Sequence, residues 1–498
     1  MKNILGREGF DNPYKGARVN EEKKDYNFSK NVKMEELDFD RLFDEINFHD
    51  GMTISFHHHL RNGDFVLNKV MKEIHKRGIK NIRIAASSIF DCHKPIVPMI
   101  EDETITDIHT SYMAGPVARA VSEGKLKNPA YITTHGGRPR AILEKELEID
   151  VAFIATPALG KDGSISGSEG VSACGSLGYG ITDCLCAKKV VALTDNLVDK
   201  VNKADLEGGF IDYYITMDKI GDPNGIVSGT TQMTKDPINL SIARKTAELI
   251  DELGIIKDGF SFQTGAGGIS LAVAKEISEL MREKKVKASF GSGGITGFFV
   301  DMLEKDMIES LEDVQCFDLE AIKSIEKNEG HKKISASRYA NPNDKCVVDD
   351  LDLVVLGASE IDMDFNVNVT TGTDGYILGG SGGHADTATG AKLTIITSKL
   401  FNARISSVVK DVRTITTPGE VVDVLVTEYG IAVNPKREDL ITYIKENTSI
   451  ELMTIEDLYK KAISFTGLGK RREKSKDLIA YSVYRDGTIL DGIYKVEN

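Results

Sequence analysis

The feature that most constrains the fold of this chain is an internal repeat with a period of about 200 residues. Three blocks recur in the same order at offsets of 206, 202 and 204 residues. They are residues 55–56 and 261–262 (Ser-Phe), 150–154 and 352–356 (an Asp followed by four apolar residues), and 187–188 and 391–392 (Ala-Lys). A near-constant period indicates copies of one structural unit. The sequence therefore predicts two copies of one domain, rather than chance similarity between short apolar strands.

The alternation of strand-like and helix-like segments indicates the class of that domain. Short apolar runs typical of buried strands occur at residues 52–56, 79–85, 151–154 and 190–193. Because helical patterns separate them, we predict βαβ units, a largely parallel sheet and an α/β fold. The expected domains are residues 46–240 and 241–498, with the active site at their interface. Residues 1–45 are expected to form an arm, with a helix from about residue 34 to 45, that wraps the other domain or a partner subunit or stays loose.

The stretch from residue 350 to 392 holds the candidate active site. Its apolar run at 353–356 predicts a buried strand, and Glu360 follows just past the end of that strand. Residues 366–369 (Asn-Val-Asn-Val) alternate as a second strand would, and residues 379–383 form a glycine-rich loop. Such a loop can bring backbone N–H groups close to an oxyanion or thioester. Alone, Glu360 is more simply an exposed residue and the loop a tight turn, but together they favour a site.

The repeat also separates Glu360 from its counterpart in the first copy. Residues 161–166 align with residues 363–368, and in this alignment Ala158 is the residue of the first copy that corresponds to Glu360. One copy therefore offers a carboxylate and the other does not. We expect one shared site, with the reacting group from the second copy and binding loops from both.

Three adjacent histidines and two arginines are further candidates for the site. His57, His58 and His59 follow a predicted strand, where consecutive side chains diverge and rarely ligate one ion. Contact with an anionic substrate, or packing, is expected for them rather than metal binding. Arg61 and Arg138 follow glycine turns or lie beside them, and an arginine can bind a carboxylate through two parallel hydrogen bonds. An ordinary surface position is the alternative for each.

Several nucleotide-binding and hydrolase motifs are absent or incomplete. The sequence has no phosphate-binding loop of the Gly-x-x-x-x-Gly-Lys-Ser/Thr type. Residues 265–268 and 291–294 match a dinucleotide-binding fingerprint only loosely. Ser381 lies in a literal Gly-x-Ser-x-Gly pattern, but four glycines around one serine fit a backbone nest at least as well as a nucleophile turn.

Composition restricts the partners. A net charge of −14 argues against binding to nucleic acid or to anionic membranes, so an anionic substrate would be bound through local cations and backbone groups. Six scattered cysteines fit a reduced cytosol. The first ten residues carry charges where a signal peptide is apolar, and no apolar run reaches the roughly 20 residues of a membrane span. A soluble cytoplasmic protein is expected.

Longer motifs lie between residues 50 and 435. They are residues 55–64 (Ser-Phe-His-His-His-Leu-Arg-Asn-Gly-Asp), 149–154, 258–268, 313–318, 357–369 (Gly-Ala-Ser-Glu-Ile-Asp-Met-Asp-Phe-Asn-Val-Asn-Val), 379–386 (Gly-Gly-Ser-Gly-Gly-His-Ala-Asp) and 427–435. With these motifs the sequence closely resembles the citrate lyase alpha chain family of the CoA-transferase superfamily. The resemblance implies two tandem CoA-transferase α/β domains. It also implies a transfer reaction, in which acetyl thioester and citrate give citryl thioester and acetate.

The same resemblance implies partners and substrates. A gamma subunit, an acyl carrier protein, would carry the acyl group on a CoA-like prosthetic group, and free CoA thioesters would also serve. A beta subunit would cleave the citryl thioester to oxaloacetate, and the chain itself would form a homo-oligomer within the complex. No tightly bound cofactor and no metal are expected.

The resemblance assigns roles to individual residues. Glu360 matches the position of the nucleophilic glutamate of the superfamily, which forms a glutamyl-CoA thioester. In the citrate lyase type, citrate attacks the acetyl thioester directly, and Glu360 would then orient substrate. Gly379, Gly380, Gly382 and Gly383 would support the oxyanion, with Gly382 and Gly383 closest to the chemistry. The expected substrate or CoA contacts are His57, His58, Arg61, Arg138, Gly265, Gly267, Gly268, Asn366, Asn368, Gly379, Gly380 and His384.

Two other functions remain open at this point. One is a CoA-transferase or CoA-hydrolase of the same fold that acts on another carboxylic acid. The other is a non-catalytic scaffold of a carrier complex, against which Glu360 and the intact glycine loop argue.

Overall fold

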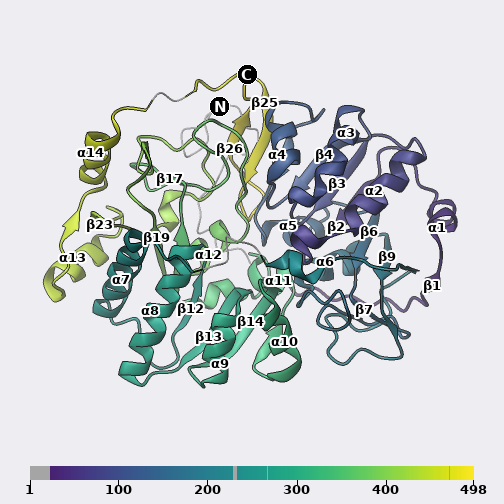
Figure 1. Ribbon diagram of the computed structural model, residues 1–498, viewed down its shortest axis with the longest axis horizontal. Coiled ribbons are helices and arrows are strands. Elements are labelled where there is room, and N and C mark those ends of the chain that lie inside the picture. Colours follow the sequence, from purple (N-terminus) through teal and green to yellow (C-terminus); the bar gives the residue numbers. More distant parts are fainter. Residues whose placement is uncertain (1–22, 228–232, 266, 470–471, 498) are drawn as a thin grey trace.

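The structure is a computed structural model that describes residues 23–227, 233–265, 267–469 and 472–497. Two α/β units lie side by side, the first in purple to blue and the second in teal to green (Figure 1). Each unit is built on a mostly parallel sheet with helices packed against it. Helix α6 (Gly178–Cys186) of the first unit contacts α11 (Ala336–Ala340) of the second, so the units share an interface.

The first unit is arranged around strand β2. The sheet order is β11-β9-β6-β2-β3-β4-β5, and all of these neighbours are parallel. The strands are β2 (Thr53–Phe56), β3 (Ile82–Ala86), β4 (Ile105–Thr110), β5 (Ala130–Ile132), β6 (Val151–Ala155), β9 (Lys189–Thr194) and β11 (Tyr213–Thr216). Its helices are α2 (Val66–Lys76), α3 (Val97–Glu101), α4 (Gly115–Ser122), α5 (Gly137–Leu143) and α6.

The second unit repeats this arrangement around β12. Its order β15-β14-β13-β12-β16-β19-β22 places three successive strands on one side of the first strand and three on the other, as in the first unit. Its strands are β12 (Ser261–Thr264), β13 (Ala288–Ile295), β14 (Ile308–Cys316), β15 (His331–Lys333), β16 (Leu353–Gly357), β19 (Leu393–Thr397), β22 (Val424–Thr427), β23 (Gly430–Val433) and β24 (Leu452–Met453). Its helices are α7 (Pro237–Glu252), α8 (Gly268–Lys284), α9 (Gly297–Glu304), α10 (Leu319–Lys327), α11, α12 (His384–Gly390), α13 (Glu438–Asn447) and α14 (Ile455–Thr466). The predicted duplicated α/β fold is confirmed.

The same polar contact occurs in each unit, at the start of strands β6 and β16. Asp150 pairs with Lys188 at 2.7 Å, and Asp352 pairs with Lys392 at the same distance. Each carboxylate also accepts the backbone N–H that opens the neighbouring strand, from Thr53 and Ser261 respectively. The recurring Asp and Lys of the repeat therefore anchor equivalent strands.

The register of the repeat differs from the prediction at one block. Strand β2 pairs Ile54 with Val151, and β12 pairs Phe262 with Leu353. Ile54 therefore corresponds to Phe262, and the predicted Ser-Phe match is displaced by two residues. Because side chains alternate between the two faces of a sheet with a period of two, the displaced match still assigned these side chains to the correct faces.

The register around Glu360 follows the prediction. Strand β7 (Ala158–Gly160) pairs with β8 (Ile165–Ser166), and β17 (Glu360–Ile361) pairs with β18 (Val367–Asn368). Ala158 lies opposite Ser166 as Glu360 lies opposite Asn368. The same short hairpin therefore follows the central strand in both units, and only the second copy has a carboxylate there.

The C-terminus corrects the predicted domain boundary. Strands β25 (Leu478–Val483) and β26 (Ile489–Tyr494) extend the sheet of the first unit beyond β5, although residues 241–498 were expected to form one domain (Figure 1). Their backbone crosses from the second unit to the first. The C-terminal strands therefore help to join the units.

The part of the predicted arm that the structure describes lies against both units. Lys24 donates its backbone N–H to Asn343 of the second unit and pairs through its ammonium with Glu144 of the first. Strand β1 (Glu35–Glu36) pairs with β11, and helix α1 (Phe39–Ile46) begins later than residue 34 because Asp38 caps it. None of the helices described combines the length and apolar character needed to cross a membrane.

Candidate active site

Glu360 is a buried carboxylate beyond the carboxyl end of the central strand β16. Its side chain is 1% exposed. One carboxylate oxygen accepts hydrogen bonds from Asn368 Nδ2 at 3.0 Å and from the backbone N–H of Arg413 at 2.8 Å. Glu360 also lines a cavity of about 290 Å³, whose other walls come from residues 404–411 and 459–469 of the same unit and from Thr373. The carboxylate is therefore held in one orientation and lies at a cavity surface.

Two asparagines expected to contact substrate instead support the segment that carries Glu360. Asn368 also donates to the carbonyl of Thr371 and accepts the backbone N–H groups of Thr370 and Thr371. Asn366 donates to Asp362 and accepts the backbone N–H of Gly419. Their amide groups make these protein contacts in the structure, and their predicted contacts with substrate stay predictions.

The glycine-rich loop crosses from the second unit to the first. The N–H of Gly382 donates to the carbonyl of Ser111 at 3.1 Å, and its carbonyl accepts the N–H of His135 at 2.8 Å. Gly382 has a φ of +51°, which favours glycine. A Cβ at Gly380 would lie 2.3 Å from the carbonyl oxygen of Ser111. The glycines therefore permit close contact between the two units at this point.

The hydrogen bonds of the loop reduce its predicted oxyanion donors from four to two. Gly379 donates its N–H to Thr370, and Gly382 donates to Ser111, so neither N–H can also serve a substrate. Within the described residues, no partner is recorded for the N–H groups of Gly380 and Gly383. These two remain candidates for oxyanion support.

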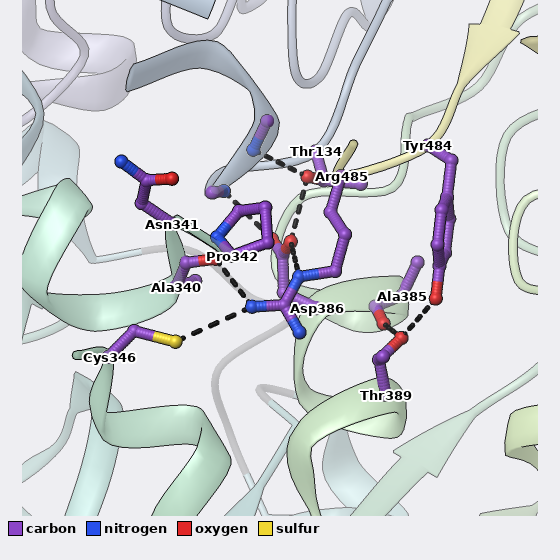
Figure 2. A network of polar contacts seen from close by, with 12 residues as sticks. Thr134, Ala340, Asn341, Pro342, Cys346, Ala385, Asp386, Thr389, Tyr484 and Arg485 are labelled. Carbon is purple, nitrogen blue, oxygen red and sulfur yellow. Dashed lines mark hydrogen bonds and ion pairs between the residues drawn. The ribbon is translucent and has the colours of Figure 1, made fainter. Parts of the chain in front are cut away.

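A buried network fixes the helix that follows the loop. Asp386 of α12 accepts the hydroxyl of Thr134 at 2.8 Å and the N–H of Gly136 at 2.9 Å, both in the first unit (Figure 2). Arg485, between β25 and β26, lies 3.7 Å from the same carboxylate and donates to the carbonyl of Ala340. Burial raises the pKa of Asp386 to about 6, although Arg485 opposes this shift. The network joins four separate segments behind the glycine loop.

His384, expected to contact substrate, holds the start of α12 against strand β16. Its Nε2–H donates to the carbonyl of Gly357 at 2.8 Å, and its Nδ1 accepts the hydroxyl of Thr417 at 2.7 Å. Burial lowers the pKa of His384 to about 4, so the ring is neutral at pH 7. Both ring nitrogens have protein partners, and the predicted contact of His384 with substrate stays a prediction.

Arg61 has an unusual environment at the interface between the units. It follows β2 in a short turn with a φ of +50°. Its guanidinium lies 5.3 Å from the ring centre of Phe90 and 4.8 Å from that of Phe317, one from each unit. Across the described part of the chain, no hydrogen bond or ion pair of this guanidinium is recorded, and its Nε is buried without a partner. Arginine remains charged in proteins, so this group is suited to an anion.

Arg138, the other candidate arginine, is part of the first unit's core. Its two terminal nitrogens each lie 2.9 Å from an oxygen of Asp183, and one also donates to the carbonyl of Ala85. The side chain is 2% exposed. Its charge is already matched by a buried carboxylate, so the prediction that Arg138 binds substrate is corrected.

The histidines beside Arg61 are neutral. His58 donates from Nε2 to Gln315 and accepts the hydroxyl of Ser87 at Nδ1, while His57 and His59 face each other at 2.7 Å. Burial lowers the pKa of His57 to about 4 and lowers the pKa of His58 well below its usual value. These rings therefore supply no positive charge for an anion. His57 fits the packing alternative, and His58 stacks on His135 with ring centres 5.6 Å apart.

Gly265, Gly267 and Gly268 lie at the start of helix α8, beside the end of β16. Gly265 donates its N–H to the carbonyl of Val355, and α8 begins at Gly268. A Cβ at Gly267 would meet no atom within 4 Å, so the space in front of the helix start is open there. A helix N-terminus of this kind favours anions. The predicted CoA contacts of Gly265, Gly267 and Gly268 stay predictions.

Three features define a CoA-transferase-like protein. They are the tandem α/β fold, the carboxylate that follows strand β16 of the second unit, and the glycine loop at the interface between the units. A family model described as "Citrate lyase, alpha subunit" matches residues 37–496. Curated citrate lyase alpha chains of Haemophilus influenzae and Klebsiella pneumoniae are 46% and 45% identical over 451 residues. That alignment covers 90% of this chain and 90% and 89% of theirs. The chain therefore belongs to the citrate lyase alpha subunit family, and its predicted activity as a citrate CoA-transferase is confirmed.

Solved structures agree with this assignment. A protein from Streptococcus mutans, described as an alpha subunit of citrate lyase in complex with citrate, has a TM-score of 0.92 and 41% identity, with full coverage of both chains. A malonate decarboxylase alpha subunit from Acinetobacter baumannii has a TM-score of 0.60 and 15% identity, covering 85% of this chain and 88% of that one. The second likeness shows a shared fold alone.

Proposed function

We propose that this chain transfers citrate onto an acyl carrier at the interface between its two units, with Arg61 binding a citrate carboxylate. The observation that carries this proposal is the environment of Arg61, a cation between two aromatic rings with no recorded carboxylate partner among the described residues. Arginine binds carboxylates through two parallel hydrogen bonds. The similar Streptococcus mutans protein, which is described as in complex with citrate, supports citrate as the acid.

The transfer has two candidate routes that differ in the role of Glu360. In the direct route, a citrate carboxylate attacks the acetyl thioester carbonyl, and the carrier thiolate leaves. The thiolate then attacks the citryl carbonyl of the mixed anhydride, and acetate leaves. In the covalent route, Glu360 attacks the acetyl thioester first and displaces the thiolate, which then attacks the glutamyl carbonyl of the mixed anhydride, so that acetate leaves and Glu360 becomes a glutamyl thioester. Citrate attacks this thioester and displaces the thiolate again, and the thiolate then attacks the citryl carbonyl and releases Glu360 as a free carboxylate. In both routes the thiolate moves from the acetyl group to the citryl group, acetate is released, and no oxidation or reduction takes place.

Both routes place negative charge on a carbonyl oxygen, and the glycine loop is the proposed source of its stabilisation. The N–H groups of Gly380 and Gly383 are the candidates, since Gly379 and Gly382 donate within the protein. Asp386 and Arg485 would act behind the loop by holding α12 against the first unit. Asn368 would act through Glu360. These three are positioning residues in this proposal.

The proposed acyl donors are acetyl-CoA and an acetylated carrier protein with a CoA-like prosthetic group. Membership of the citrate lyase alpha family supports a complex in which a beta subunit cleaves the citryl thioester and a gamma subunit is the carrier. We further propose that the complex is cytoplasmic, that this chain is a homo-oligomer in it, and that no cofactor is bound tightly.

The test is to mix the purified chain with acetyl-CoA and citrate and to follow citryl-CoA and acetate by mass spectrometry. Equal amounts of the two products are expected. Other carboxylic acids assayed in parallel address the alternative of a CoA-transferase for another acid, which would be favoured if one of them gave a higher kcat/KM than citrate. Hydrolysis of acetyl-CoA without citryl-CoA would contradict the proposal.

A further inference from the structure

The cavity beside Glu360 is too small for a complete CoA-like group. Its volume is about 290 Å³, and hairpin β20–β21 (Phe401–Asn402 and Ile405–Ser406), residues 408–411 and the end of α14 form most of its wall. Sites that enclose a whole small ligand have volumes of about 300–1,000 Å³. A slender thioester arm can therefore enter, while the remainder of the group and whatever carries it stay outside.

Apolar side chains gather where this cavity meets the surface. Ile405 and Leu468 line the cavity and are 53% and 77% exposed. Phe465 of α14, outside the cavity wall, is 55% exposed and makes tilted ring contacts with Phe401 and Tyr429, whose ring centres are 5.3 and 5.4 Å away. Exposed apolar groups gathered in one place mark interaction surfaces. These ring contacts hold Phe465 in place, so its outward face is fixed.

The same rim has a local excess of positive charge. Arg404 and Lys410 line the cavity and are exposed, and no ion pair or hydrogen bond of either side chain is recorded within the described ranges. One carboxylate, Asp411, shares the rim. The adjacent sequence, residues 470–476, contains five Lys or Arg and one Glu, in a chain with a net charge of −14. This local positive charge attracts an anionic partner. It also makes this rim the place where a second, equally acidic copy of the chain would be repelled least.

We propose that the rim formed by Arg404, Ile405, Lys410, Phe465 and Leu468 is the docking surface of an acidic acyl carrier protein, whose thioester arm enters the cavity toward Glu360. The inference rests on the proposed function, because it supplies the acyl group to the same site. Free CoA would bind through the cavity and the cations of the rim. The apolar groups that face solvent, Phe465 outside the cavity and the largely exposed Leu468 at its mouth, suit a protein surface. The two sources of thioester are therefore separable by substitution.

The test assays two acyl donors with the wild-type chain and with two rim variants, Phe465→Asp and Leu468→Asp. The kcat/KM is measured with the acetylated carrier subunit of a citrate lyase complex and with free acetyl-CoA, both at saturating citrate. For each variant, the fold-decrease in kcat/KM with the acetylated carrier is expected to be at least ten times the fold-decrease with acetyl-CoA. Leu468 is 77% exposed, so its variant is expected to fold, and its melting temperature confirms this. Val171→Asp is the matched control, because Val171 is 71% exposed in the first unit, and no loss is expected.

The outcomes separate the two proposals. Equal losses with both donors, or no loss with the carrier, would overturn the docking surface and leave the transferase reaction intact. If the wild-type chain transferred citrate from neither donor, the proposed function itself would fall. A smaller salt dependence of kcat/KM for the carrier in Arg404→Ala and Lys410→Ala variants is expected, and an unchanged dependence would count against charge recognition by this rim.

Discussion

Arg61 and Arg138 are a matched pair of arginines that the structure places in opposite roles. Arg61→Met removes the charge and keeps an unbranched chain between Phe90 and Phe317. Hydrogen bonds to charged groups contribute about 1.5–3 kcal/mol each. Loss of one bidentate carboxylate contact, about 2–4 kcal/mol after partial compensation by water, corresponds to roughly a 30- to 1,000-fold rise in the KM for citrate. The KM for acetyl-CoA is expected to stay near that of the wild type.

Folding stability provides the contrast. Arg61 has no recorded hydrogen bond among the described residues, so Arg61→Met should lose only its aromatic contacts, about 1–2 kcal/mol. Arg138→Met leaves Asp183 charged and fully buried, which costs about 3–5 kcal/mol of unfolding free energy. Initial-rate kinetics and urea unfolding of both variants measure the two effects. A citrate KM within twofold of wild type for Arg61→Met would refute the assignment of Arg61 to citrate.

Other predictions concern the carboxylate, the loop and the buried network. Glu360→Gln should lower kcat by at least about a hundredfold without loss of folding, and transfer at the wild-type rate would remove Glu360 from the chemistry. Asn368→Ala should lower kcat about tenfold through loss of one hydrogen bond to Glu360, with citrate KM unchanged; a rise in KM alone would indicate substrate contact instead. Gly380→Ala should lower activity and melting temperature, because its Cβ meets the Ser111 carbonyl, whereas Gly357→Ala, with open space around its Cβ, should keep the wild-type melting temperature. Burial raises the folded pKa of Asp386 from 3.8 to about 6, so its protonated form contributes stability below pH 4 that is lost as pH rises through 6. This contribution, on the order of 2–3 kcal/mol, should be absent from Asp386→Asn when urea unfolding is compared at pH 4.5 and 7, and identical pH profiles would contradict it.

The fold was predictable because its signals are local and occur twice. The apolar runs that became β6 and β16, and the Asp and Lys that flank them, recur at one period. The two-residue error at β2 and β12 arose because a short Ser-Phe match satisfies the same alternation in either register. The start of α1 could also have been predicted, since Asp38 is a favourable cap. The crossing of β25 to the first sheet leaves no local trace in the sequence.

The site was predictable only where one segment holds all the parts. Glu360, its partner Asn368 and the glycine loop lie within 25 residues, and the sequence placed them together. The sequence could not reveal that Asp183 neutralises Arg138, or that Phe317 of the other unit covers Arg61, because these contacts join distant segments. Asp386 lies in a motif already noted, but its partner Arg485 is 99 residues further along the chain.

The most direct test of this account is the structure of the chain with citrate bound. The account predicts a citrate carboxylate against the guanidinium of Arg61 at the interface between the units, with Arg138 still paired to Asp183. Citrate bound elsewhere, with no contact to Arg61 at a saturating concentration, would contradict the central claim.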